Sequence, residues 1–139
     1  MLTISQLLQA TWPTPRANSR DVILRSIKSG VTRTGRLPKV IAVAYSPVTP
    51  EGKAKRQISM HKCSVTAVDQ KKGFKGYVKV LCDCEYQTYY NEVALHKHGA
   101  SDIVYSNGEP PVDRNPSYKP NLCKHLYALC KRIKGAPKL

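Results

Sequence analysis

Four residues whose side chains bind borderline metal ions stand in two tight pairs. Cys82 and Cys84 are two positions apart, and so are Cys123 and His125, with residues 85–122 between the pairs. Three thiolate sulfurs and one imidazole nitrogen fill the four positions of a tetrahedral zinc ion and leave none open. The spacing therefore predicts one closed Cys3His site that holds Zn2+ and is structural.

The residues before the first pair favour a β-strand, because they are rich in aromatic and β-branched side chains. Alternate side chains of a strand share one face. Asp83 is therefore expected to point away from the core. The side chains expected on the core face are Val78, Val80, Cys82 and Cys84.

Apolar residues recur at helical spacing around and after the second pair. They are Leu122, Leu126, Leu129, Cys130 and Ile133. Cys123 and His125 are then expected in the first turn of a C-terminal helix that ends near Gly135. The metal would join the end of a strand to the start of a helix.

Other cysteines and histidines offer competing ligand pairs. His96 and His98 are close in sequence, and His61 and Cys63 share one face of an expected strand. Neither pair has the strand and helix context of the main four, so we expect surface or core residues. Cys130 is expected to be a buried free thiol.

A thiol beside an imidazole is also the arrangement of an activated nucleophile, which Cys123 and His125 could provide. No third group that would orient the imidazole is evident. The sequence contains no phosphate-binding glycine loop and no metal-hydrolase motif. We therefore expect neither enzyme activity nor a small-molecule substrate.

The pattern Cys-x-Cys, a variable insert and then Cys-x-His at the start of a helix resembles the SWIM-type zinc finger. Here it consists of Cys82-Asp83-Cys84 and of residues 120–129, PNLCKHLYAL. The resemblance implies that Cys82, Cys84, Cys123 and His125 are the zinc ligands. It also implies a partner that is DNA or protein. The insert is longer than the usual short ββα layout accommodates.

The insert carries a second resemblance. Residues 99–111, GASDIVYSNGEPP, running into the Cys-x-His half, are similar to SWIM-bearing structural proteins of tailed bacteriophages. This resemblance implies a virion component of the tail, baseplate or neck. Its partners would be other virion proteins, and it would lie in the host cytoplasm before assembly.

The charge of the chain is large and uneven. The formal net charge is +14, yet residues 83–113 hold six of the nine acids and one of the 23 bases, which leaves 22 bases against three acids elsewhere. Such a field attracts polyanions, so DNA is the alternative partner. The expected phosphate contacts lie on two turns, Lys53, Lys55 and Arg56 on one and Lys71, Lys72 and Lys75 on the next. An alternative is that these charges only keep the surface well solvated.

Length and hydropathy favour a soluble domain. The 139 residues contain no apolar run of membrane length, and no basic segment precedes an apolar block at the N-terminus. We expect neither a signal peptide nor a membrane partner. An odd number of cysteines, five, favours a reducing compartment over a disulfide framework.

The expected fold is α+β: a small antiparallel sheet, a C-terminal helix joined to it by the Cys3His zinc site, a long insert and a helical N-terminal arm. Alternation and turn signals predict a meander of about three strands over residues 39–45, 57–68 and 77–81. Residues 37–139 would form the SWIM-like domain.

The insert, residues 85–122, is expected to begin with a helix that ends near Gly99 and to continue as a turn-rich loop. It would be either a partner-binding loop or a flap over the zinc site.

Residues 1–36 are expected to form a basic helical arm. One helix spans residues 3–12, and its apolar face must pack on the domain or on a partner. The segment from Trp12 to Pro15 breaks it. A second helix runs from residue 18 or 19 to Gly30. The pair is either a docking arm or a peripheral part of the domain.

Overall fold

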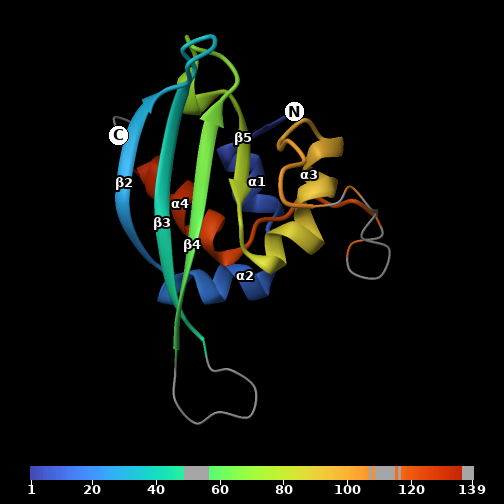
Figure 1. Cartoon of the computed structure of the whole chain (residues 1–139). Helices are drawn as coiled ribbons and strands as arrows, with labels where there is room; N and C mark the ends of the chain where they lie inside the picture. Colours follow the sequence, from blue (N-terminus) through green and yellow to red (C-terminus); the bar gives the residue numbers. More distant parts are fainter. Residues whose placement is uncertain (49–56, 107, 109–114, 116, 136–139) are drawn as a thin grey trace.

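The structure is a computed structural model, and the residues that it describes are 1–48, 57–106, 108, 115 and 117–135. Five strands form one antiparallel sheet in the order β1-β5-β4-β3-β2 (Figure 1). The strands are β1 (Leu2–Thr3), β2 (Ile23–Val31), β3 (Pro38–Val48), β4 (Gln57–Ala67) and β5 (Tyr77–Cys82). The α-helices are α1 (Ile4–Ala10), α2 (Pro13–Asn18), α3 (Glu92–Lys97) and α4 (Lys124–Gly135). The expected α+β architecture with a C-terminal helix is confirmed.

The expected meander is the centre of the sheet. β3, β4 and β5 pair in sequence order, and the β4–β5 register places Cys63 opposite Cys82. Alternate side chains of these strands face the helices and are buried, as the period of a strand requires. They are Val40, Ala42 and Ala44 of β3, Cys63 and Val65 of β4, and Val78, Val80 and Cys82 of β5.

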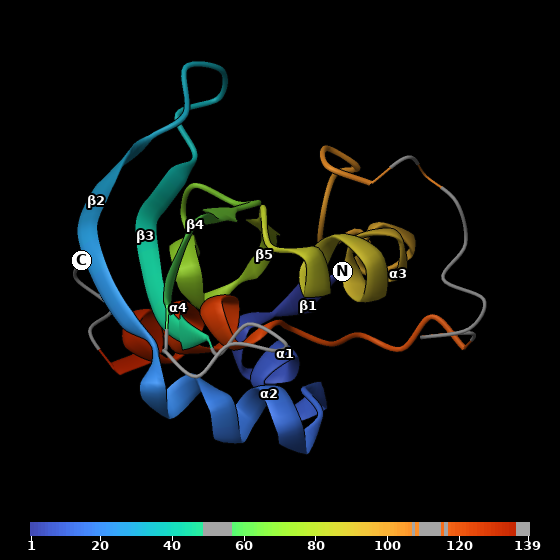
Figure 2. The same cartoon turned by 60° about the horizontal axis from the view of Figure 1, so that its bottom comes forward.

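The C-terminal helix closes the core from one side. α4 packs on β3, β4 and β5, and α1 and α2 pack on α4 on the same side of the sheet (Figures 1 and 2). Its apolar stripe is fully buried, which contributes about 2 kcal/mol for each large side chain. The stripe consists of Leu126, Leu129, Cys130 and Ile133. No helix in the described ranges is both long and apolar enough to cross a bilayer.

The first N-terminal helix packs on the domain. Thr3 and Gln6 form the expected capping box, with Thr3 Oγ1 accepting from the Gln6 N–H at 3.2 Å and Gln6 Oε1 accepting from the Thr3 N–H at 2.8 Å. Ile4, Leu7 and Leu8 on its apolar face are buried in the same cluster as the sheet and α4. The apolar face of this helix therefore packs on the domain, which was one of its two expected locations.

Two short helices meet at the segment from Trp12 to Pro15. α1 ends at Ala10, and α2 begins with Pro13 at its first position. Proline is favoured there, since the N–H that it lacks has no partner inside a helix in any case. The expected break is thus followed at once by a second, short helix.

The predicted helix from residue 18 to Gly30 is wrong, because most of this stretch is the edge strand β2. A bulge between Arg25 and Lys28 interrupts the β2–β3 ladder, and Ser26 within it has a φ of 52°. Leu24 and Ile27, on either side of Ser26, both pack against the core. The bulge adds a residue between inward-facing positions, so their spacing of three imitates a helix.

The expected boundary between residues 36 and 37 lies in the turn that joins β2 to β3. Both of these strands belong to the one sheet, and α1 belongs to the one core. Residues 1–36 are therefore built into the same fold as the cysteines.

The insert begins with the expected helix. A π-helical turn (Gln87–Asn91) leads into α3, and Gly99, with a φ of +71°, follows the end of that helix. The buried carboxylate of Glu92 accepts hydrogen bonds from three successive backbone N–H groups, those of residues 104–106. The carboxylate thereby fastens the loop after α3 to the helix.

Candidate metal centre

The four predicted ligands meet in the folded chain. Sγ of Cys82, Cys84 and Cys123 and a ring nitrogen of His125 all lie within 4.8 Å of one another, and all four residues are buried. In a tetrahedral zinc site with bonds of about 2.0 to 2.3 Å, donor atoms lie about 3.5 to 3.8 Å apart. The cluster therefore needs little contraction to hold one ion. The expected Cys3His arrangement between strand and helix is confirmed.

β5 delivers the first pair. Cys82 is the last residue of this strand and is fully buried, and Cys84 is 4% exposed, whereas Asp83 between them is partly exposed. The alternation of the strand thus continues one step past its end. It aims both thiol groups at α4, as the period of two predicted.

Two of the sulfurs lie at the starts of helical segments. Cys84 Sγ accepts from the N–H of Gln87 at 3.4 Å, and Cys123 Sγ accepts from the N–H of Leu126 at 3.4 Å. In both cases the donor is three residues further on, as in an N-cap. These N–H groups and the positive ends of the two segments stabilise negative charge on sulfur, which favours thiolate ligands.

His125 is held in one orientation by β3. Its Nε2 lies 3.0 Å from Ser46 Oγ, and its Nδ1 lies 3.9 Å from Cys82 Sγ. Ser46 is buried, and its Oγ also lies 2.9 Å from Ser59 Oγ of β4. Such a partner on the remote nitrogen fixes which nitrogen faces the metal. Nδ1 is therefore the donor atom that His125 offers.

A histidine and an aspartate flank the cluster. The His61 ring lies 4.8 Å from the His125 ring, and His61 Nδ1 lies 2.9 Å from Asp83 Oδ1. The Lys62 N–H also donates to Asp83 Oδ1, at 3.2 Å. Asp83 is thereby tied to β4, which holds the Cys-x-Cys segment against the sheet.

Buried amides connect the insert to the second pair. Gln87 Oε1 accepts from the Cys123 N–H at 2.9 Å and from Asn91 Nδ2 at 2.9 Å. Asn121 Nδ2 donates to Asn91 Oδ1 at 3.1 Å, and Asn121 Oδ1 accepts from the Trp12 N–H at 2.9 Å. This network joins the N-terminal region, the insert and the segment that precedes α4.

The three thiol groups share their protons unequally. Hydrogen bonds from Cys123 and Cys82 hold the pKa of Cys84 far below its ordinary value. Burial, followed by the bonds to Cys82 and Cys84, raises the pKa of Cys123. For Cys82 the hydrogen bond with Cys123 lowers the pKa, but the bond with Cys84 and burial outweigh this effect, so the pKa is raised overall. The cluster thus favours one negative charge, and a divalent cation would supply the charge that removes the remaining protons.

The other candidate ligands lie outside the cluster. His96 Nδ1 lies 3.1 Å from the Ser101 carbonyl, and His98 Nε2 lies 2.9 Å from the Tyr118 carbonyl. Cys63 is buried with its Sγ directed at the Ala42 carbonyl, and burial raises its pKa to about 12. His61 and Cys63 therefore form no ligand pair.

Cys130 is fully buried in the core, and burial raises its pKa. It is the buried free thiol that its position on the apolar stripe of α4 predicted.

A hollow of about 400 Å3 reaches the cluster from the side of α2. Cys84, Cys123 and His125 form part of its wall, and His61 and Lys124 form another part. The three ligands in this wall are each at most 4% exposed. The hollow provides a path by which an ion can reach the donor atoms.

Three of the six residues predicted to contact phosphate lie within the described part of the chain. Lys71, Lys72 and Lys75 are exposed in the β4–β5 turn. Lys53, Lys55 and Arg56 lie outside the described residues.

Sequence reasoning missed the residues that support the ligands, namely Ser46, Gln87, Asn91 and Asn121. Buried polar side chains in otherwise apolar or helical segments are the only signal that could have pointed to them. Their partners are up to 109 residues away, as between Trp12 and Asn121.

Comparisons with family models, with curated proteins and with solved structures found no match for this chain.

Proposed function

We propose that this chain is a non-enzymatic interaction protein whose fold is stabilised by one zinc ion. The observation that carries this proposal is the cluster of four buried donor atoms within 4.8 Å. Four protein ligands complete a tetrahedral shell and leave no position for a substrate or water. Cys82, Cys84, Cys123 and His125 therefore serve stability.

Zinc is the ion that this donor set favours. Thiolate ligands exclude the hard cations Ca2+ and Mg2+, which take oxygen donors. A tetrahedral set of three sulfurs and one nitrogen is typical of structural zinc. The N–H groups of Gln87 and Leu126, which donate to two sulfurs, offset the negative charge of such a complex.

The resemblance to SWIM-type zinc fingers supports a partner that is protein or DNA. The resemblance of the insert to structural proteins of tailed phages supports a virion role. In this proposal the chain is a tail, baseplate or neck component that docks to neighbouring virion subunits. α1 is committed to the core, so the insert is the better docking element. Three successive apolar or aromatic residues of the insert are exposed, with exposed fractions of 39% for Ile103, 54% for Val104 and 46% for Tyr105.

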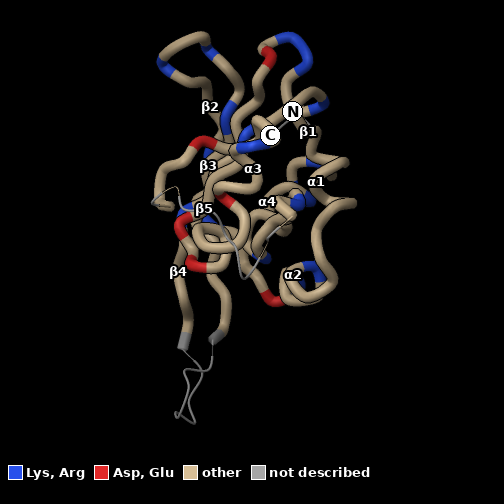
Figure 3. Tube along the Cα trace, turned by 90° about the vertical axis from the view of Figure 1, so that its right-hand side faces the viewer, with Lys and Arg blue, Asp and Glu red and all other residues tan. Residues whose placement is uncertain are grey.

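The alternative is nucleic-acid binding through the basic loops. The β2–β3 and β4–β5 turns lie at the same end of the sheet, where Figure 3 shows Lys and Arg in both turns. Around this end lie the exposed side chains of Arg33, Arg36, Lys71, Lys72, Lys75 and Lys134. Lys134 and the β4–β5 lysines line one hollow of about 690 Å3. This gathering of charge favours the alternative enough to test it.

The first experiment measures metal content by mass spectrometry on protein purified without chelator, together with the native mass. We expect one zinc per chain. Cys84→Ser and Cys123→Ser should each lose the metal and aggregate or unfold locally. Cys130→Ala, which removes a buried thiol outside the cluster, is the matched control and should retain it. Full zinc content and an unchanged melting temperature in both ligand variants would refute the proposed site.

The second experiment separates the two kinds of partner. Duplex DNA binding is measured at a salt concentration of about 0.15 M, because any strongly basic protein binds DNA at low salt. Tight, selective binding would favour the nucleic-acid alternative. Its absence in a zinc-loaded protein would direct the search to neighbouring virion subunits.

A further inference from the structure

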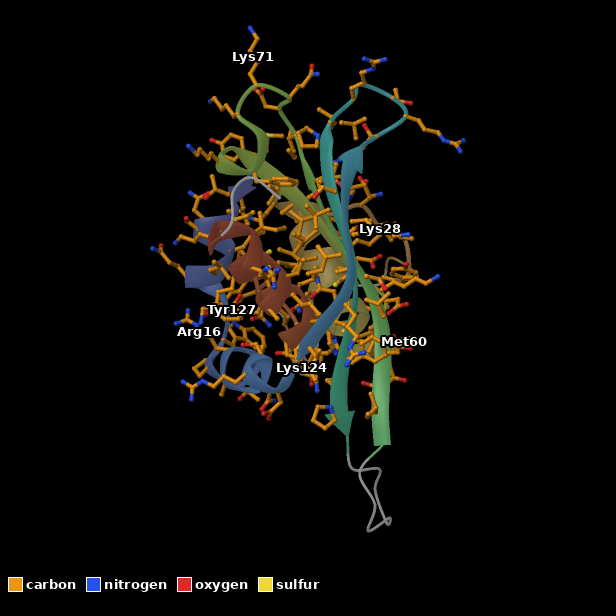
Figure 4. All side chains as sticks on the ribbon, turned by 90° about the vertical axis from the view of Figure 1, so that its left-hand side faces the viewer. Arg16, Lys28, Met60, Lys71, Lys124 and Tyr127 are labelled. Atoms are coloured by element: carbon orange, nitrogen blue, oxygen red, sulfur yellow. The ribbon has the colours of Figure 1, made fainter. Side chains whose placement is uncertain are left out.

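One face of the sheet carries no helix in the described parts of the chain. α1, α2 and α4 all lie on the other side, and Figure 1 looks onto the uncovered face. In Figure 4 the side chains of Lys28 and Met60 project from this face, on the side away from Tyr127 and Arg16. We call it the open face and define it by the outward residues of β2 to β5.

The strand register shows which side chains are neighbours on the open face. Lys28 of β2, Ile41 of β3, Ser64 of β4 and Leu81 of β5 form one row across four strands. The next row contains Arg25, Val43 and Lys62, and Lys39 lies two residues before Ile41 on the same face. Adjacent strands are about 4.8 Å apart, so the cations lie within about 15 Å of one another around an apolar centre.

The centre of the open face is hollowed. The hollow has a volume of about 380 Å3, and Ile41, Val43 and Leu81 contribute to its floor. Lys28, Lys39, Lys62 and Tyr105, the last from the insert, also line it. This volume is within the range of pockets that hold small molecules. A flat protein partner would not fill it, whereas a nucleobase is small enough to enter it and lie against its apolar side chains.

No acidic residue lines this hollow among the residues that the structure describes. Two acids next to β5 have partners. Asp83, which follows β5, is bonded to His61 and the Lys62 N–H, and Asp102 forms an ion pair of 3.0 Å with Lys79. Lys28, Lys39 and Lys62 have no ion-pair partner within the described residues. The open face is therefore cationic at its rim and apolar at its centre.

We propose that the open face binds single-stranded nucleic acid, with bases in the hollow against Tyr105 and the aliphatic floor and with phosphates on Lys28, Lys62 and their cationic neighbours. A single strand combines bases, whose flat faces stack on aromatic and apolar side chains, with regularly spaced negative charges, which matches this surface. A duplex keeps its bases stacked and presents only phosphate to a sheet face. The proposal goes beyond the function proposed above and depends on neither zinc nor a virion role.

The test is fluorescence anisotropy with a labelled oligothymidylate of about 20 nucleotides and a duplex of equal length, both at about 0.15 M salt. The single strand should bind more tightly than the duplex. Lys28→Glu combined with Lys62→Glu should weaken binding at least tenfold. It should also reduce the magnitude of the slope of log K against log salt by about 1.4, since each lost contact removes about 0.7.

Lys71→Glu combined with Lys72→Glu is the matched control, because it changes the charge equally in the β4–β5 turn. It should leave the salt slope unchanged. Tyr105→Ala should weaken binding about fivefold or more with no change in slope, and Tyr105→Phe should restore the affinity. All of these side chains are exposed, and an unchanged melting temperature and zinc content would exclude misfolding.

Several results would overturn the proposal. They are preference for the duplex, the absence of single-strand binding at this salt concentration, and equal losses in the two lysine pairs. Tight duplex binding lost only in the Lys71 and Lys72 variant would support the basic loops instead. A protein with no zinc that still bound oligothymidylate through Lys28 and Lys62 would uphold this proposal while refuting the metal site.

Discussion

Ser46 Oγ, near the end of β3, lies 3.0 Å from Nε2 of His125 and joins this strand to the first turn of α4. When Nδ1 binds a metal, Nε2 carries the proton and donates it to this hydroxyl. The hydroxyl thus selects the tautomer and the ring orientation that the cluster requires.

Ser46→Ala should lower zinc affinity about tenfold or more, since partners of metal-bound histidines typically contribute 10- to 100-fold. Competition with a chromophoric chelator measures this loss. Ser59→Ala is the control, because Ser59 bonds Ser46 and has no bond to His125. Equal losses in the two variants would mean that the effect is general loosening of the β3–β4 pair.

Zinc affinity should rise with pH. The pKa of Cys84 is lowered, so this residue is already ionised, whereas the raised pKa values of Cys82 and Cys123 keep both as thiols at neutral pH. Zinc then displaces two protons, and the dissociation constant should increase about 100-fold for each pH unit of acidification near neutrality. Chelator competition at several pH values measures the slope. A flat profile would contradict the assignment of thiolate ligands.

Cys63 should be inert to alkylation in the folded protein. It is 3% exposed, and burial raises its pKa to about 12, so neither the thiolate nor an access path is available at pH 8. Mass spectrometry after iodoacetamide treatment should find Cys63 unmodified in native protein and modified in urea. Rapid labelling of Cys63 in the native protein, with the zinc still bound, would contradict its placement in the core.

The raised pKa of Cys63 also predicts that the folded state loses stability at alkaline pH. The folded protein holds the Cys63 proton more strongly than the unfolded chain does. The stability that this thiol contributes to the folded state is therefore complete below about pH 9 and is lost as the pH rises towards 12. Cys63→Ala should therefore show a smaller decrease in the free energy of unfolding between pH 8 and pH 10 than the native sequence. Denaturant unfolding at both pH values measures the difference, and an equal decrease would contradict it.

Glu92→Gln should release the loop after α3. Glu92 is fully buried, and its carboxylate accepts from the N–H groups of Val104, Tyr105 and Ser106, which a neutral amide replaces poorly. We expect a cost of about 1 to 3 kcal/mol and faster hydrogen exchange at these three amides. Glu85→Gln, at an exposed position, should change neither quantity. Unaltered exchange in the Glu92 variant would refute the anchoring role.

The ligand set and its two supporting elements could be predicted from the sequence, because both depend on local periodicity. Alternation along β5 places Cys82 and Cys84 on one side of the strand. The helical spacing of the apolar residues places Cys123 and His125 at the start of α4. The amphipathic first helix with its capping box was predictable for the same reason. The identity of the metal, the SWIM relationship and the partner remain predictions.

The strand β2 could not be predicted locally. Its bulge at Ser26 places the inward residues Leu24 and Ile27 three apart, and an edge strand buries little that would reveal its period. Pairing with β3, which is set by the tertiary structure, overrides the local signal. The same holds for the inclusion of residues 1–36 in the one fold, since α1 joins its core and β2 joins its sheet.

The sequence by itself determined which four side chains could bind a metal and which local elements present them, because residue type and periodicity act over a few positions. Only the tertiary structure decided what surrounds them. The Ser46 hydroxyl on His125, the Gln87 amide on the Cys123 backbone and the open cationic face of the sheet all join residues far apart in the chain. Such contacts depend on strand register and helix docking, which minimise the free energy of the whole chain at once.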